Sequence, residues 1–212
     1  MDSIQKRKLL KIFSKLYPNP ASELTFKNEY QLIISVVLSA QCTDRKVNEV
    51  TPELFKKFSH FSKLKMGKVA EVEAIIRQIN YYKTKARNLI ALAEMIETRF
   101  GGEIPKSFEE IILLPGVGRK TASVVLGELG ITETFPVDTH VFRVSQRLGL
   151  ASGKTPEQIE DQLKSSFPPK RWRPLHHWLI FHGRRVCKAQ RPLCQSCTLV
   201  SLCPQKGVPH NI

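Results

Sequence analysis

Apolar residues recur every three or four positions along much of this chain, which is the spacing of one face of an α-helix. Such faces predict helices near residues 3–16, 43–58, 69–79 and 83–100. The segment 29–40 is almost wholly apolar, so its spacing fits a buried helix or a buried strand, and its length favours the helix. No segment alternates apolar and polar residues between hairpin turns. We therefore predict an all-α fold.

Capping and turn residues indicate where helices begin and end. Residues suited to capping a helix N-terminus are Asp2 or Ser3, Thr43, Ser107 with Glu110, and Thr155 with Gln158. The pair Gly101-Gly102 can end a helix in the left-handed conformation. We expect a turn at Asn80-Tyr81-Tyr82, ahead of the helix near 83–100.

The charge of the chain favours a nucleic-acid partner. Lys and Arg outnumber Asp and Glu by 33 to 19, and the formal net charge is +14. The basic residues gather near predicted turns and helix ends, at Lys83/Lys85/Arg87, Arg119/Lys120, Lys170/Arg171/Arg173 and Arg184/Arg185/Lys188/Arg191. The alternative is an ordinary solvated basic surface.

Nothing in the sequence predicts a membrane segment. The longest mainly apolar stretch, Leu32–Ala40, has about half of the roughly 20 residues that a bilayer span needs. The polar start Met1-Asp2-Ser3 lacks the apolar region of a signal peptide. We therefore expect a cytoplasmic protein.

The segment 111–122 predicts two helices joined by a glycine hairpin. Glycines allow a sharp turn and a close approach of the backbone, and the free N–H groups that open the second helix point toward any anion there. A DNA phosphate is the anion we expect. The contributing residues are Gly116, Val117, Gly118, Arg119 and Thr121. An ordinary turn between two helices is the alternative.

Two residues near this hairpin could carry chemistry. Lys120 lies in the first turn of the second helix, where the helix dipole disfavours a further positive charge and favours the neutral, nucleophilic amine. Such an amine can attack a sugar C1′ and form a Schiff base, although a single lysine is more often only solvated. Asp138 precedes another helix and can cap it. A carboxylate in that place can also stabilise a cationic sugar or relay a proton from Lys120.

Four of the five cysteines lie in one short segment: Cys187, Cys194, Cys197 and Cys203. Four thiolates favour a soft metal centre, and a reducing compartment disfavours disulfides. Structural zinc usually takes close cysteine pairs, and only the middle two cysteines have that spacing. We therefore predict one 4Fe-4S cluster, which would hold the loop so that Lys188 and Arg191 reach phosphates.

The hairpin 114–122, the segment 137–140 and the cysteine loop together resemble the endonuclease III family of DNA glycosylases. The segments 38–44 and 176–179 add to the resemblance, which runs over practically the whole chain. The family implies a helix-hairpin-helix glycosylase fold with two helical domains flanking a DNA-binding cleft. By this resemblance residues 21–133 form a helical barrel domain, with the hairpin motif at about 108–130. Residues 1–20 and 134–212 form the second domain, which carries the cysteine loop.

The resemblance also implies an activity. It implies a monomer at the nucleoid that flips oxidised pyrimidines such as thymine glycol out of double-stranded DNA. Lys120 would displace the base and cleave the abasic site by β-elimination, with help from Asp138. Gln41 matches the residue that fills the gap in the duplex, and Arg184 belongs to the basic surface that we expect to bind DNA.

Two positions depart from the family pattern. Asn80 stands where related sequences commonly have glycine, and we expect it to take the left-handed conformation, which asparagine tolerates. Tyr81 stands where an aliphatic wedge is usual, and it could stack on a base.

Other functions compete with this interpretation. One is an adenine-excising glycosylase, although that branch lacks the lysine present here as Lys120 and generally carries a further C-terminal domain. The other is a non-catalytic iron-sulfur DNA-binding or damage-sensing module, against which the presence of both Lys120 and Asp138 argues.

Overall fold

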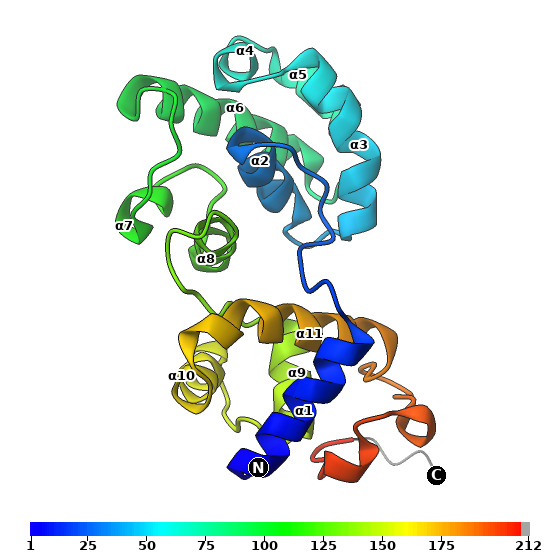
Figure 1. Ribbon diagram of the computed structural model, residues 1–212. Helices are drawn as coiled ribbons and strands as arrows, with labels where there is room; N and C mark the ends of the chain where they lie inside the picture. Colours follow the sequence, from blue (N-terminus) through cyan, green and yellow to red (C-terminus); the bar gives the residue numbers. More distant parts are fainter. Residues whose placement is uncertain (209–212) are drawn as a thin grey trace. The chain divides into compact units, whose positions relative to one another are not determined.

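The computed structural model describes residues 1–208, and all regular structure in this range is helical (Figure 1). The predicted all-α fold is therefore confirmed. The chain forms two compact units. The central unit is Ser22–Thr132, and the terminal unit is Met1–Ala21 together with the chain from Glu133 onward. Among the described residues no helix is long and apolar enough to cross a membrane.

The central unit is built around one buried helix. Its elements are α2 (Glu29–Ser39), α3 (Asp44–Lys57), α4 (Phe61–Lys65), α5 (Val69–Ile76), α6 (Tyr82–Arg99), α7 (Phe108–Ile111) and α8 (Arg119–Glu128). The apolar segment predicted as a helix is α2, which packs against α3, α6 and α8. Because it has neighbours on several sides, it is apolar nearly all round. α6 also packs against α4 and α5.

The terminal unit joins the first helix to the last third of the chain. Its elements are α1 (Ser3–Leu16), α9 (Thr139–Arg147), α10 (Pro156–Ser166), η1 (Pro169–Arg171), α11 (Trp172–Arg185), η2 (Cys194–Ser196) and η3 (Val200–Leu202). α11 packs against both α1 and α9 (Figure 1). The ring of Phe13 stacks on Trp178 at 5.9 Å between centroids, and the Trp178 indole N–H donates to the carbonyl of Tyr17.

The predicted helix caps are confirmed at several positions. The Asp2 side chain accepts from the N–H groups of Ile4 and Gln5, which forms a full capping box on α1. Thr43 and Thr155 also cap α3 and α10 through their side chains, but Gln158 does not complete the predicted capping box, because its Oε1 atom accepts from the N–H of Lys154. Gly101 and Gly102, which follow α6, both have positive φ, as expected. These local signals were readable because each depends on residues only a few positions apart.

The helix before the hairpin is shorter than the sequence predicted. α7 ends at Ile111, and Ile112 and Leu113 are exposed by 37% and 51%. Pro115 explains part of this, because the residue before a proline is pushed away from the helical conformation. Leu114 is buried and its carbonyl accepts from the N–H of Val117, which closes the turn instead.

Candidate functional site

The hairpin between α7 and α8 depends on a glycine with a positive φ. Gly116 has φ 79°, and a Cβ there would lie 3.1 Å from the Nδ2 atom of Asn88 and 3.3 Å from Cγ1 of Val37. A side chain at this position would be both strained and crowded. Val117, the next residue, is buried and anchors the turn to the core of the central unit.

The second glycine opens α8 and leaves the N-terminus of that helix accessible. Gly118 is the N-cap residue, and no side chain caps the helix there. A Cβ at Gly118 would have no neighbour within 4 Å. The first N–H groups of α8 have no side-chain cap and the N-cap residue is uncrowded, an arrangement that suits an anion. Lys120 is exposed in this first turn, and the Arg119 guanidinium lies 5.5 Å from the ring of Phe108.

Asp138 begins α9 in the terminal unit. Its Oδ1 atom accepts a hydrogen bond from the N–H of Val141 at 2.7 Å, so the predicted N-cap is confirmed. The carboxylate also influences its neighbour: burial lowers the pKa of His140, and the charge of Asp138 opposes that shift. Lys120 belongs to the central unit, so the two residues predicted to act together come from different units.

Gln41 and Tyr81 are both exposed, and both have the left-handed conformation, with φ 54° and 58°. The expectation that Asn80 would be left-handed was wrong, because Tyr81 takes that conformation instead. Asn80 uses its side chain differently: its Nδ2 atom donates to the carbonyl of Gln41 at 2.7 Å. This bond ties the turn before α6 to the turn after α2. A non-glycine residue is rarely left-handed, so each of these two turns holds some strain.

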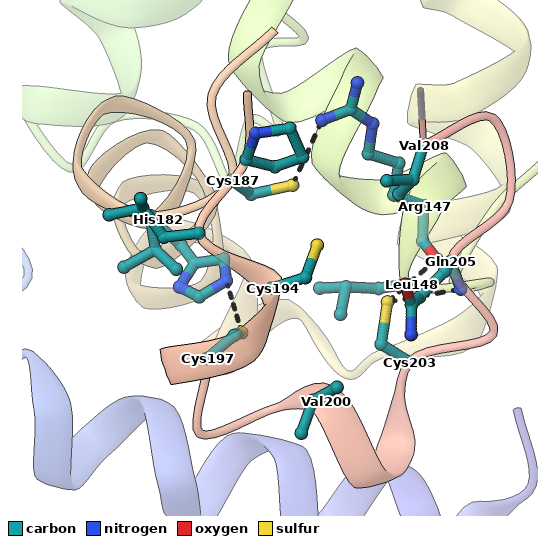
Figure 2. A pocket seen from close by; sticks show the side chains of 13 residues that line it. Arg147, Leu148, His182, Cys187, Cys194, Cys197, Val200, Cys203, Gln205 and Val208 are labelled. Carbon is teal, nitrogen blue, oxygen red and sulfur yellow. Dashed lines mark hydrogen bonds between the residues drawn. The ribbon is translucent and has the colours of Figure 1, made fainter. Parts of the chain in front are cut away.

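The four clustered cysteines line one pocket in the terminal unit (Figure 2). The cysteine loop, residues 187–203, follows α11 and contains η2 and η3. The pocket wall also includes Arg147, whose Nη1 atom lies 3.5 Å from Sγ of Cys187. His182 contributes as well, with its Nε2 atom 3.6 Å from Sγ of Cys197. Cys42 lies elsewhere, half-buried against the core of the central unit.

The donor set of this pocket fits an iron-sulfur cluster. All four cysteines are free thiols whose side chains reach the same space. Burial raises the pKa of both Cys197 and Cys203, and the other cysteines raise it further. A positively charged iron centre would offset that shift. Within residues 1–208 no three His, Cys, Asp or Glu side chains are arranged around a single metal ion, so the fit rests on these four sulfur donors.

Three basic residues near the cysteine loop are exposed, as expected. Arg184 lies in the last turn of α11, and Lys188 and Arg191 lie in the loop itself. The carbonyl of Lys188 accepts a hydrogen bond from Arg147 at 2.7 Å. Arg191 has a positive φ of 49°. The cysteine loop thus exposes the side chains of Lys188 and Arg191, while Arg147 holds its main chain.

Comparison with known proteins identifies the family. Residues 34–169 match the HhH-GPD superfamily of base excision DNA repair proteins. The chain is also 44% identical to endonuclease III of Rickettsia conorii over 92% of its own length and 93% of that protein. The chain belongs to the endonuclease III family. Endonuclease III of Escherichia coli strain K12 is 40% identical over 96% of the chain and 98% of that protein.

Solved structures of the endonuclease III family agree with this assignment. A trapped endonuclease III–DNA covalent intermediate matches with a TM-score of 0.89 and 41% identity, covering 97% of both chains. A non-covalent endonuclease III–DNA complex matches with a TM-score of 0.90. As a member of this family, the chain is a DNA glycosylase with abasic-site lyase activity in base excision repair. Family membership is also consistent with a 4Fe-4S cluster.

Two residues of the site region were misjudged or missed in the sequence. Lys85 was assigned to a basic surface group, but it is buried, with 7% of its surface exposed. Its separation from Leu89 and Leu92 places it on the apolar face of α6, so the spacing already contained that signal. Arg147 is 5% exposed and also went unnoticed. The partners of its guanidinium lie some 40 residues further along the chain, beyond the reach of local patterns.

Proposed function

We propose that this protein removes oxidised pyrimidines of the thymine glycol type from double-stranded DNA and cleaves the resulting abasic site by β-elimination. One observation carries the proposal. Lys120 is an exposed amine in the first turn of α8, directly after a hairpin that leaves the helix N-terminus uncapped. A phosphate bound to those N–H groups would place the neighbouring sugar within reach of a nucleophile.

The chemistry assigned to Lys120 is a displacement followed by an elimination. Its neutral Nζ atom attacks C1′, and the bond from C1′ to the base breaks with its electron pair going to the base, which takes up a proton. The sugar ring opens to give a Schiff base on Lys120. Loss of a proton from C2′ then expels the 3′ phosphate, and water finally releases the lysine. Asp138 accepts the proton from Lys120 and stabilises positive charge on the sugar.

The proposed cofactor is one 4Fe-4S cluster on Cys187, Cys194, Cys197 and Cys203. When bound, it supplies a covalent cross-link within the cysteine loop and takes no part in the glycosylase steps. The protein side of this assembly is already organised. Arg147 donates to the carbonyls of Lys188 and Ala189 at 2.7 and 3.0 Å, which holds the loop from inside. The exposed Lys188 and Arg191 would then meet the DNA backbone.

The remaining DNA contacts follow from exposure and position. The hairpin residues Gly116, Val117, Gly118, Arg119 and Thr121 would bind a phosphate through their main chain and the Arg119 charge. Arg184 would add a backbone contact from α11. Gln41 would fill the gap that the flipped nucleotide leaves. We also propose that the enzyme acts as a monomer on the DNA of the nucleoid and that the central and terminal units are the two domains of the family.

Tyr81 would stack on a base beside the lesion, because it is exposed by 67% and held at the tip of its turn. A Tyr81→Leu variant should change the relative rates on different oxidised pyrimidines. An unchanged ranking of lesions would show that the ring makes no selective contact.

The deciding experiment is borohydride trapping on duplex DNA that contains one thymine glycol. The intact protein should form a covalent adduct, Lys120→Ala should abolish it, and Asp138→Asn should slow it. Lys56→Ala, at an exposed lysine of α3, is the matched control and should trap normally. Base release without an adduct would contradict the role of Lys120. Release of adenine instead of thymine glycol would support the adenine-excising alternative.

A further inference from the structure

We propose that Asn80 and Lys85 are positioning residues that hold the main chain of Gln41 in its left-handed conformation before DNA binds. This inference rests on the proposed role of Gln41 as the residue that fills the gap in the duplex. Asn80 and Lys85 belong to the central unit and would act on Gln41, whereas Gln41 itself would enter DNA. The turn that contains Gln41, residues 40–42, directly follows α2.

Lys85 fixes the peptide plane that precedes Gln41. Its Nζ atom donates to the carbonyl of Leu38 at 2.8 Å and to that of Ala40 at 2.5 Å. The Ala40 carbonyl belongs to the peptide group that ends at the nitrogen of Gln41. A cation at the C-terminus of a helix also satisfies carbonyls that have no partner within the helix. Lys85 therefore holds one side of the turn.

Asn80 fixes the peptide plane that follows Gln41. Its side-chain amide donates to the Gln41 carbonyl at 2.7 Å. Rotation about φ moves the first plane relative to Cα, and rotation about ψ moves the second. When both carbonyls are held, neither rotation is free. The two donors together thus determine the backbone conformation of Gln41.

The arrangement opposes the intrinsic preference of the residue it holds. Glutamine at φ 54° is disfavoured, so a free turn would leave this conformation for much of the time. The structure also keeps a buried ammonium to maintain it, although burial lowers the pKa of Lys85. Strain that is held in place by surrounding groups is typical of residues prepared for binding. The Gln41 side chain remains exposed, as a group that enters DNA must be.

The bond from Asn80 also couples two exposed side chains. Tyr81, the next residue, is left-handed as well, with φ 58°. Gln41 and Tyr81 therefore project from two turns that one hydrogen bond joins. Holding both turns before binding lowers the conformational entropy lost when the protein enters the duplex.

The first test measures the turn without DNA. Hydrogen exchange of the segment 39–43 should be faster in Asn80→Ala than in the intact, cluster-loaded protein, because the Cys42 N–H bond to Ser39 opens when the turn relaxes. Lys85→Met should show the same change. The matched control is Gln78→Ala, at an exposed residue two positions before Asn80. Unchanged exchange in both Asn80→Ala and Lys85→Met would overturn the proposal.

The second test separates gap filling from chemistry. On duplex DNA with thymine glycol, Asn80→Ala should lose about tenfold in kcat/KM, the value of one hydrogen bond, mainly through KM. Cleavage of a single strand with one abasic site, where no gap forms, should be unchanged. In a Gln41→Gly background, where positive φ carries no strain, the effect of Asn80→Ala should fall below about twofold.

The possible failures are distinguishable. If the intact protein cleaves the lesion but Asn80→Ala matches it on the duplex, the positioning role is wrong and the proposed function stands. If Asn80→Ala is equally impaired on the single strand, the effect lies in chemistry rather than insertion, and the inference is also wrong. If the intact protein processes neither substrate, the proposed function itself fails.

Discussion

Gly116 and Gly118 lie two residues apart in one hairpin, and a methyl group would meet neighbours at only one of them. At Gly116 a Cβ would press on Asn88 and Val37, whereas at Gly118 it would find no atom within 4 Å. Gly116 also has a positive φ, and Gly118 has an extended backbone. Contacts within the protein therefore account for glycine at position 116. At position 118 they do not, and close approach of a bound ligand is the remaining reason for glycine there.

The two glycines should respond oppositely to alanine. Gly116→Ala should destabilise the fold by about 1–3 kcal/mol, because it adds strain and crowding. Gly118→Ala should leave the free energy of unfolding nearly unchanged but weaken DNA binding, since the added methyl group stands where the backbone would approach a phosphate. Urea unfolding and binding to an abasic-site duplex measure the two effects. Normal binding by Gly118→Ala would remove this hairpin from the DNA interface.

The N-cap role of Asp138 can be separated by substitution from the catalytic role proposed for it. Asn also caps helices well, so Asp138→Asn should keep the stability while it slows base release. Asp138→Ala removes the acceptor for the Val141 N–H and should cost about 1 kcal/mol as well. Thermal unfolding and single-turnover excision report the two roles. Full activity in Asp138→Asn would show that the residue only caps α9.

Arg147 should protect the iron-sulfur cluster proposed for the cysteine loop. Its guanidinium donates to two loop carbonyls and lies against Sγ of Cys187, so Arg147→Met should lose iron to a chelator about tenfold faster. Arg45→Met, at an exposed arginine of α3, is the control. Iron and sulfide content per chain over time give the readout. Equal rates of iron loss would show that the cysteines hold the cluster without this support.

Tyr30 should make the fold sensitive to high pH. Its hydroxyl donates to the carbonyl of Phe58 at 2.6 Å, and burial raises the pKa of Tyr30. A raised pKa in the folded state means that the unfolded chain ionises first, so this contribution is complete below about pH 10 and is lost as the pH rises further. Tyr30→Phe should be less stable by about 1 kcal/mol at neutral pH.

The pH dependence of stability distinguishes ionisation of Tyr30 from simple loss of its hydrogen bond to the Phe58 carbonyl. Above about pH 10 the stability of the intact protein should fall more steeply than that of Tyr30→Phe, by up to about 1.4 kcal/mol per pH unit. Denaturant unfolding across that range supplies the measurement, with Tyr81→Phe at an exposed tyrosine as the control. Parallel stability curves for the intact protein and Tyr30→Phe would contradict the assignment to Tyr30.

Local sequence signals predicted where the helices lie, but they did not predict the contacts between segments that are distant in the sequence. The apolar run at 29–40, the cap at Thr43 and the glycines after α6 each depend on residues close in sequence, and each was confirmed. The conformation at Asn80 was misassigned because a partner 39 residues away, the Gln41 carbonyl, engages its side chain. The spacing of Lys85 indicated its burial but not its hydrogen bonds, since the carbonyls that accept from it lie more than 40 residues earlier. The four cysteines predicted their shared pocket through spacing alone.

The terminal unit has a consequence for how the chain is made. The hydrogen bond between Tyr17 and His182 spans 165 positions, and Phe13 packs on Trp178 in the same region. On the ribosome, α1 emerges long before either partner has been synthesised. The apolar face of α1 stays without its partners while the whole central unit is translated, and the cysteine loop is synthesised after that. The core of the terminal unit therefore forms late in synthesis. In a chain that is stalled before α11, the first helix has no partner for its apolar face.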